Sequence, residues 1–214
     1  MIVDLRITEI FYSLQGETRT VGLPTVFIRL TGCPLRCGYC DTAYAFHGGK
    51  SRSIDYILLE TERYKPKYVT VTGGEPLAQP ACHDLLEKLC DRQYEVSLET
   101  SGAMDIAAVD PRTVIVMDIK TPGSKEVAKN RYSNIDHLKQ TDQIKFVICD
   151  RADYEWAKEL LITKSLSHRC EILFSPAYEQ LDYHHLADWI IEDNLPVRFQ
   201  IQLHKIVWGN TPGK

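Results

Sequence analysis

Short β-branched segments alternate with helical segments along most of the chain. The strand-like segments are Ile7–Tyr12, Thr25–Thr31, Tyr68–Thr72, Glu95–Thr100, Thr113–Lys120, Gln143–Ile148, Glu171–Ser175 and Val197–Gln202. The helical segments are Ile54–Arg63, Pro80–Arg92, Ala152–Thr163 and Tyr183–Glu192. From Thr25 onward the two kinds alternate about six times, which requires a parallel sheet with right-handed crossovers. Because 214 residues are fewer than the roughly 250 of a complete eight-fold barrel, the sequence predicts an α/β fold, a truncated, partial (β/α)6-type barrel.

The composition is that of one ordinary globular domain. Hydrophobic residues make up 44% of the chain and charged residues 25%, and no linker or internal repeat divides residues 1–214. Apolar runs are far shorter than the roughly 18 residues of a membrane span, and the N-terminus lacks a secretion signal. We therefore expect a cytoplasmic protein without membrane association. The net charge of −4 argues against non-specific nucleic-acid binding and favours a smaller partner.

Three of the seven cysteines form one compact motif. Cys33, Cys37 and Cys40 lie in a C-x3-C-x2-C spacing on a predicted loop, residues 33–40. Three thiolates at this spacing can hold three irons of a 4Fe-4S cluster and leave the fourth iron open to another ligand. The alternative is a structural zinc ion with His47 as the fourth ligand. The spacing therefore indicates a metal centre of one of these two kinds.

A glycine pair ends the strand that follows this loop. Val69–Thr72 runs into Gly73-Gly74-Glu75-Pro76, where glycine permits close backbone approach to a ligand, although an ordinary turn would explain the pair as well. The cysteine motif and this segment together resemble the radical S-adenosylmethionine (SAM) superfamily. The resemblance implies a 4Fe-4S cluster whose open iron is chelated by SAM, with Gly74 near the amino group of SAM.

Further segments resemble one family within that superfamily, the 7-carboxy-7-deazaguanine synthases. They are Glu9–Thr18, Phe27–Cys33, Cys40–Thr42, Ser97–Gly102, Lys145–Ile148 and Gln202–Lys205. The resemblance covers nearly the whole chain and implies a radical SAM form of the partial barrel. Members of this family contract 6-carboxy-5,6,7,8-tetrahydropterin to 7-carboxy-7-deazaguanine, with loss of ammonia, on the route to queuosine and related 7-deazapurines. The resemblance also implies a homodimer and a flavodoxin or ferredoxin as reductant.

Two other functions share parts of this pattern. A glycyl-radical enzyme activase has the same cluster motif and a comparable size, but acts on a protein. A zinc-stabilised binding module without catalysis would account for the cysteines alone. The loop at Leu14–Glu17 argues against the activase, because it offers amide, carboxylate and carbonyl groups suited to a pterin edge.

Candidate substrate contacts gather in several segments. The resemblance places the pterin at Leu14, Gln15, Gly16, Glu17, Arg29, Thr72, Glu99 and His204. Alternation along Thr25–Leu30 independently points Arg29 into the barrel, where it would bind the carboxylate of the substrate or form an internal salt bridge. Alternation along the last predicted strand likewise puts Gln200, Gln202 and His204 on one polar face.

Candidate cofactor contacts follow from the resemblance. It implies SAM binding by Gly74, by Asp118, Ile119 and Lys120, and by Ser175, Pro176, Ala177 and Tyr178. Some relatives read Ser-Pro-Lys where this chain reads Asp-Ile-Lys. Thr42 matches the position at which the family binds Mg2+, an ion that keeps several waters and takes other ligands from substrate. In one described form of the family the terminal carboxylate reaches the substrate, but the tail after Trp208 departs from that pattern.

Overall fold

A computed structural model describes residues 4–211 and 213 of the chain. The strands are β1 (Asp4–Leu14), β2 (Pro24–Leu30), β3 (Lys50–Ser53), β4 (Tyr68–Gly73), β5 (Glu95–Thr100), β6 (Val114–Asp118), β7 (Gln143–Ile148), β8 (Glu171–Pro176) and β9 (Arg198–Phe199). The α-helices are α1 (Ile54–Glu62), α2 (Cys82–Asp91), α3 (Arg151–Thr163), α4 (Tyr183–Glu192) and α5 (Leu203–Trp208). No helix within these residues is long and apolar enough to cross a membrane. The ends of the predicted domain, 1–3, 212 and 214, lie outside the described residues.

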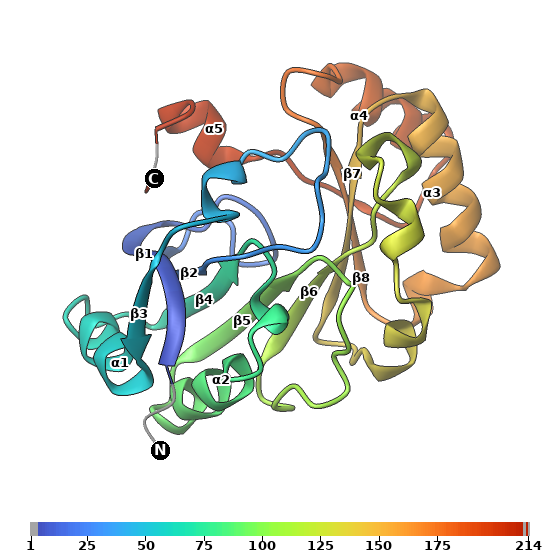
Figure 1. Ribbon diagram of the computed structural model, residues 1–214. Coiled ribbons are helices and arrows are strands. Elements are labelled where there is room, and N and C mark those ends of the chain that lie inside the picture. The colour runs from blue at the N-terminus through green and yellow to red at the C-terminus, as the bar shows by residue number, and fades with distance from the viewer. Residues whose placement is uncertain (1–3, 212, 214) are drawn as a thin grey trace.

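All nine strands belong to one sheet, in the order β3-β1-β2-β4-β5-β6-β7-β8-β9. β1 pairs antiparallel with β2 and β3, and every pairing from β2 to β9 is parallel. Figure 1 shows the sheet curving, with α1 and α2 outside one half and α3 and α4 outside the other. The segment that follows β2 and helix α5 lie over its inner side. This arrangement confirms the predicted partial α/β barrel.

The two faces of the strands differ in chemistry. On β2, Val26, Ile28 and Leu30 are completely buried in the core that the helices cover, and Val69 and Val71 on β4 are buried in the same way. Because side chains alternate along a strand, the residues between these point to the inner side of the sheet. The predicted alternation on β2 is therefore confirmed, and the inner face presents Phe27 and Arg29 to the cavity.

One observed strand was not predicted, and one predicted strand ends earlier than expected. The crossovers from β5 to β6 and from β6 to β7 contain only turns and short 3-10 segments, as expected for Thr121–Leu138. β3 was not expected, because Lys50–Ser53 has no apolar alternation and becomes a strand by pairing with β1. The predicted strand Val197–Gln202 is wrong beyond Phe199, since the chain leaves the sheet there and forms α5.

Candidate active site

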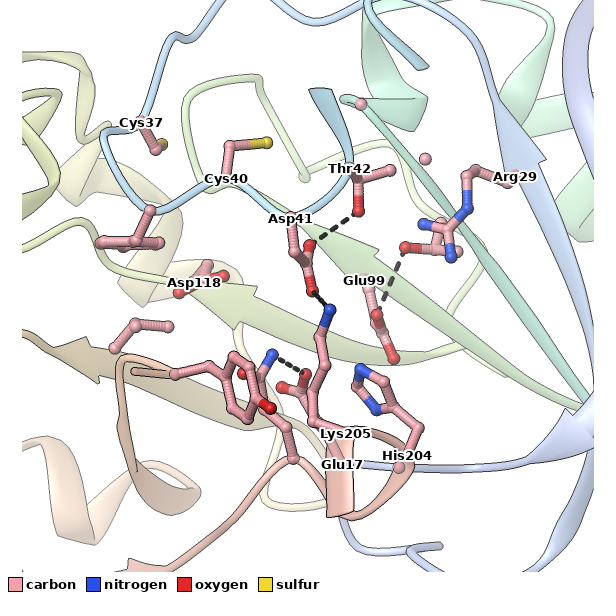
Figure 2. A pocket seen from close by; sticks show the side chains of 18 of the residues that line it. Glu17, Arg29, Cys37, Cys40, Asp41, Thr42, Glu99, Asp118, His204 and Lys205 are labelled. Atoms are coloured by element: carbon pink, nitrogen blue, oxygen red, sulfur yellow. Dashed lines mark hydrogen bonds and ion pairs between the residues drawn. The ribbon is translucent and has the colours of Figure 1, made fainter. Parts of the chain in front are cut away.

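A cavity of about 460 Å3 opens on the inner side of the sheet, at the carboxyl ends of the parallel strands. Such ends are where barrels of this type place ligands, and the volume suits a small molecule. Figure 2 shows side chains from the loop after β2, from several strands and from α5 pointing into it. Its lining includes these candidate residues: Leu14, Gln15, Gly16, Glu17, Arg29, Cys33, Cys37, Cys40, Thr42, Thr72, Gly74, Glu99, Asp118, Lys120, Ala177, Tyr178 and His204.

All three clustered cysteines line this cavity, from a loop fixed on both sides. The loop is anchored by the buried Leu35 and by the amide of Gly38, which donates to the carbonyl of Ser124 at 3.1 Å. Arg36 stacks on Phe46, 4.2 Å from the ring centroid, and also donates to a loop carbonyl. The cysteine positions are therefore determined by packing of the loop itself.

The donor set suits an iron–sulfur cluster better than a single zinc ion. Across residues 4–211 and 213, no three His, Cys, Asp or Glu side chains gather closely enough to hold one metal ion. His47, the proposed fourth zinc ligand, is exposed and lies outside the cavity lining. A closed zinc site needs four ligands around one ion, whereas cysteine ligands of a cluster each bind a different iron. The cysteine triplet therefore fits a 4Fe-4S cluster.

Gly73 and Gly74 allow β4 to pack directly against the cysteine loop. A Cβ at Gly73, whose φ is 150°, would overlap the carbonyl oxygen of Leu30, and one at Gly74 would overlap that of Gly32. The Gly74 amide donates to the Leu30 carbonyl at 3.2 Å. Both glycines also face the cavity, so the backbone here is open to a ligand.

Glu75, the next residue, organises the neighbouring strand end. It is fully buried, and its carboxylate accepts hydrogen bonds from the Leu77 amide (3.0 Å), the Thr100 hydroxyl (2.9 Å) and the Ser101 amide (2.7 Å). A buried carboxylate is stable only with such partners. The Gly-Gly-Glu-Pro segment therefore holds the end of β5 at the cavity, a role that sequence reasoning missed.

The loop that follows β1 makes a polar floor. The amide nitrogen of Gln15, which is almost fully buried, donates to Thr70 and to Glu99, both at 3.2 Å. The side-chain carbonyl oxygen of Gln15 (Oε1) accepts a hydrogen bond from the backbone amide of Glu17 at 3.1 Å, and the Thr72 hydroxyl donates to Glu99 at 3.3 Å. Burial raises the pKa of the Glu99 carboxyl, and nearby Glu17 adds to the rise.

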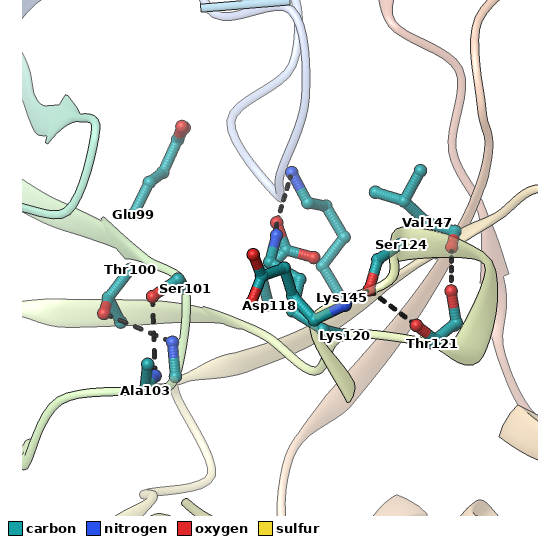
Figure 3. A network of polar contacts seen from close by, with 12 residues as sticks. Glu99, Thr100, Ser101, Ala103, Asp118, Lys120, Thr121, Ser124, Lys145 and Val147 are labelled. Carbon is teal, nitrogen blue, oxygen red and sulfur yellow. Dashed lines mark hydrogen bonds and ion pairs between the residues drawn. The ribbon is translucent and has the colours of Figure 1, made fainter. Parts of the chain in front are cut away.

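A chain of buried charges crosses the cavity from Glu17 to Lys120. Lys145 Nζ lies 2.7 Å from a carboxylate oxygen of Glu17. It also lies 3.6 Å from Asp118, and Lys120 Nζ lies 3.1 Å from Asp118 (Figure 3). Burial alone would raise the pKa of Glu17, but Lys145 and His204 outweigh it and lower that pKa. Burial would lower the pKa of Lys145, yet Asp118 and Glu17 raise it well above its ordinary value. All four groups are therefore held in their charged forms.

Helix α5 closes one side of the cavity. The His204 imidazole packs so tightly on Gly16 that a Cβ there would overlap it, and the Leu203 amide donates to the Gly16 carbonyl at 2.9 Å. Burial lowers the pKa of His204. Lys205 Nζ lies 3.5 Å from Asp41, which accepts from the Thr42 hydroxyl at 2.8 Å (Figure 2). His204 thus reaches the cavity from a helix and not from the predicted strand.

Comparisons with known proteins agree with this geometry. The model of the Radical SAM superfamily matches residues 27–161, more than half of the chain. The 7-carboxy-7-deazaguanine synthase of Chlorobaculum tepidum is 42% identical over 208 residues, covering 96% of this chain and 94% of the relative. The chain belongs to the 7-carboxy-7-deazaguanine synthase family of radical SAM enzymes. The 7-carboxy-7-deazaguanine synthase of Koribacter versatilis is 41% identical, with 95% of this chain and 97% of the relative covered.

Solved structures share the fold. The crystal structure of QueE from Escherichia coli superposes with a TM-score of 0.77 at 24% identity, over 94% of this chain and 95% of that one. Streptococcus suis SuiB bound to its precursor peptide SuiA gives a TM-score of 0.59 at 14% identity, over 80% of this chain and 46% of the other. The radical SAM family uses a 4Fe-4S cluster and SAM, which the cysteine loop and the glycine pair can accommodate.

Three of the residues expected to contact SAM in this family member lie away from the cavity lining. Ile119 points to the opposite face of the sheet and belongs to the hydrophobic core. Ser175 and Pro176 are buried at the end of β8, while the next two residues, Ala177 and Tyr178, do line the cavity. The terminal carboxylate, on Lys214, lies outside the described residues.

Sequence reasoning also missed a pair of oppositely charged groups at the cavity. Asp41 directly follows the third cysteine, so its place at the cavity could have been inferred from the loop. Lys205 lies on α5, a helix that was not predicted, so its sequence position did not indicate that it would face the cavity. Both line the cavity and form an ion pair beside Thr42.

Proposed function

We propose that this protein catalyses the ring contraction of 6-carboxy-5,6,7,8-tetrahydropterin to 7-carboxy-7-deazaguanine, with loss of ammonia, in the biosynthesis of queuosine and other 7-deazapurines. The observation that carries the proposal is that one cavity joins the three-cysteine loop to the Gln15–Glu17 loop and Arg29. Membership of the 7-carboxy-7-deazaguanine synthase family supports the same reaction.

The cofactor side of the cavity is the end near the cysteines. We assign Cys33, Cys37 and Cys40 to the 4Fe-4S cluster. Gly74, Asp118, Lys120, Ala177 and Tyr178 are the candidate SAM contacts that line the cavity. The bound cluster and SAM supply radical chemistry at the C6 hydrogen of the substrate, and the protein orients both molecules and excludes water.

The substrate side is the polar floor formed by Gln15, Glu17, Thr72, Glu99 and His204. These groups present amide donors, carboxylate acceptors and an imidazole within one lining, which matches the donor and acceptor edge of a pterin. Hydrogen bonds among Gln15, Glu17, Thr72 and Glu99 hold these four residues in place before the substrate arrives, and packing on Gly16 holds His204. Such preorganisation keeps the pterin aligned with the cofactor side.

Other parts of the proposal concern partners of the enzyme. Thr42 is assigned to Mg2+, supported by its place at the cavity beside the Asp41 carboxylate. We further propose a flavodoxin or ferredoxin as reductant and a homodimer, which the family resemblance supports, and a cytoplasmic location. Neither a glycyl-radical activase nor a zinc module is retained, because full-length relatives carry the synthase name.

An anaerobic assay tests the proposal. The purified protein, with its cluster reconstituted, is incubated with dithionite, SAM and the carboxypterin, with and without Mg2+. We expect 7-carboxy-7-deazaguanine and ammonia by mass spectrometry and chemical assay, and a higher rate with Mg2+. Unchanged pterin in the presence of an intact, reducible cluster would contradict the proposed reaction, and an equal rate without Mg2+ would contradict the magnesium assignment.

A further inference from the structure

We propose that Glu9 is a positioning residue that fixes the Arg29 guanidinium so that its two terminal nitrogens face the carboxylate of the substrate. The inference rests on the proposed function, because it names how that site recognises a carboxylated ring. Glu9 itself lies outside the cavity lining, whereas Arg29 is part of it. Glu9 therefore acts from behind the arginine and does not contact the substrate.

An irregularity in β1 puts Glu9 opposite Arg29. The pairing of β1 with β2 matches Ile7 with Leu30 but Glu9 with Arg29, so one extra residue, Thr8, bulges from β1. Ile7 and Leu30 both face the hydrophobic core. Because side chains alternate, an unbroken register would direct Glu9 to that core, and the bulge turns it to the inner face instead.

The contact between the two side chains uses a particular edge of the guanidinium. Arg29 Nε donates to Glu9 Oε1 at 2.8 Å, with the two side chains 16% and 23% exposed. Within the described residues this is the one hydrogen bond made by the Arg29 side chain. Nη1 and Nη2 keep their donors, and they are the pair that binds a carboxylate at two points.

Aromatic rings hold the same group from other directions. The Arg29 guanidinium carbon lies 5.7 Å from the ring centroid of Phe11 and 5.9 Å from that of Tyr44. Phe11 is itself stacked on Phe27 at 5.0 Å, and the Tyr44 hydroxyl donates to Glu9 Oε1 at 2.8 Å. The guanidinium is thus held by the Nε edge and by ring contacts, which leaves the Nη edge for a ligand.

This arrangement sets specificity for a carboxylated substrate. A bidentate arginine–carboxylate pair is directional, so a guanidinium that rotates freely would lose one of its two bonds. Figure 2 shows Arg29 pointing toward the part of the cavity that also holds Thr42 and Glu99. A ligand without the carboxylate would gain nothing from the fixed arginine, and its affinity would not depend on Glu9.

Binding measurements on cluster-loaded protein, without SAM or reductant, test the inference. Calorimetry compares the carboxypterin with tetrahydropterin, which lacks the 6-carboxylate, at constant Mg2+. For Glu9→Ala we expect carboxypterin affinity to fall by about tenfold, while tetrahydropterin affinity stays within about twofold. Glu9→Gln keeps an oxygen that can accept from Nε and should restore most of the affinity. Glu60→Ala, which removes the partner of the exposed Arg63 at the end of α1, is the matched control and should bind like the wild type.

A double-mutant cycle separates positioning from general structural damage. In an Arg29→Ala background, adding Glu9→Ala should cause no further loss of carboxypterin affinity, because the group it positions is gone. An unchanged affinity in Glu9→Ala, an equal loss for both ligands, or a further loss in the double variant would overturn the inference. If the wild-type protein binds no carboxypterin, the proposed function itself fails, and with it the role of Glu9.

Discussion

The same parallel strands carry two different surfaces. On β4, Val69 and Val71 are fully buried in the core under the helices, while Thr70 and Thr72, which alternate with them, face the inner side. There Thr72 lines the cavity and Thr70 accepts a hydrogen bond from the Gln15 side chain. The outer face is packed in the hydrophobic core, and the inner face carries a network of hydrogen bonds and charges beside a few apolar residues such as Phe27 and Val116. One strand therefore serves stability with every second residue and ligand binding with the others.

Side chains on the two faces contribute to stability in different ways. An outer-face residue must fill space, and its loss costs transfer energy and leaves a cavity. An inner-face residue such as Glu99 or Lys145 must keep specific partners, and its loss leaves another buried polar group unpaired. Substitutions on the two faces should thus separate effects on stability from effects on catalysis.

The largest effect is expected for Lys145→Met on the inner face. It removes the cation between Glu17 and Asp118, and breaking a buried pair from one side typically costs about 3–5 kcal/mol. We expect product formation to be lost together with this stability, measured by denaturant unfolding and by the anaerobic assay. Lys145→Arg, which keeps the charge, should recover part of both; full activity in Lys145→Met would show that the charge chain is dispensable.

An outer-face variant should affect stability alone. Ile28→Ala on β2 removes a completely buried side chain, and core truncations of this kind cost about 2–5 kcal/mol. At a temperature where the variant is folded, its KM for the carboxypterin should equal that of the wild type. Ile28→Val, with a cost of about 1 kcal/mol, is the control. A raised KM in Ile28→Ala would mean that the two faces are not independent.

Two inner-face carboxyls are expected to respond to pH in opposite directions. The pKa of Glu17 is lowered in the fold, because Lys145 and His204 outweigh burial, so its charged form contributes stability above its unfolded value of 4.5. That contribution is lost as the pH falls through the lowered pKa. The pKa of Glu99 is raised by burial, so its charged form costs stability once the pH exceeds the unfolded value.

Substituting Glu17 or Glu99 should therefore change the free energy of unfolding in opposite directions. At pH 7, Glu17→Gln should destabilise the protein and Glu99→Gln should stabilise it. The Glu17 difference should shrink as the pH falls below about 4.5, whereas the Glu99 difference should already shrink as the pH falls toward about 4.5. Unfolding curves at several pH values check this, and a shift of the same sign for both variants would contradict the assigned charge states.

The sequence predicted which residues lie on the outer face better than it predicted the contacts on the inner face. Alternation along Thr25–Leu30 correctly separated the core residues from Arg29, since it depends only on the period of a strand. The partner of Arg29 could not be predicted in the same way. Glu9 shares its face only because a bulge shifts the register of β1, and a bulge depends on how two strands pair.

The elements at the two ends of the sheet could not be predicted from local sequence either. β3 is a polar edge strand whose form comes from β1, and α5 is a short helix with no completely buried residue. His204 was nevertheless placed in the site by family resemblance, while its element was wrong. The cysteine spacing indicated a metal centre, and together with the glycine pair it carried the resemblance to the radical SAM superfamily, because those motifs are local. The charge chain through Lys145 instead joins segments far apart in sequence.

The smallest effects, from a reciprocal exchange on β4, give the most direct comparison of the two faces. Thr70 and Val71 are neighbours of nearly equal shape and are both buried. Thr70→Val removes hydrogen bonds to Gln15 (3.2 Å) and Ser97 (2.8 Å), and Val71→Thr puts a hydroxyl into the apolar core, so each should cost about 1–2 kcal/mol.

Catalysis should distinguish these two variants although their stabilities are similar. Thr70→Val frees Gln15 on the substrate side, so its KM for the carboxypterin should rise, whereas Val71→Thr should keep the wild-type KM. Steady-state assays with matched unfolding curves measure both. Equal KM values in the two variants would show that the hydroxyl of Thr70 serves stability alone, and the inner face would then differ from the outer one only where it carries charge.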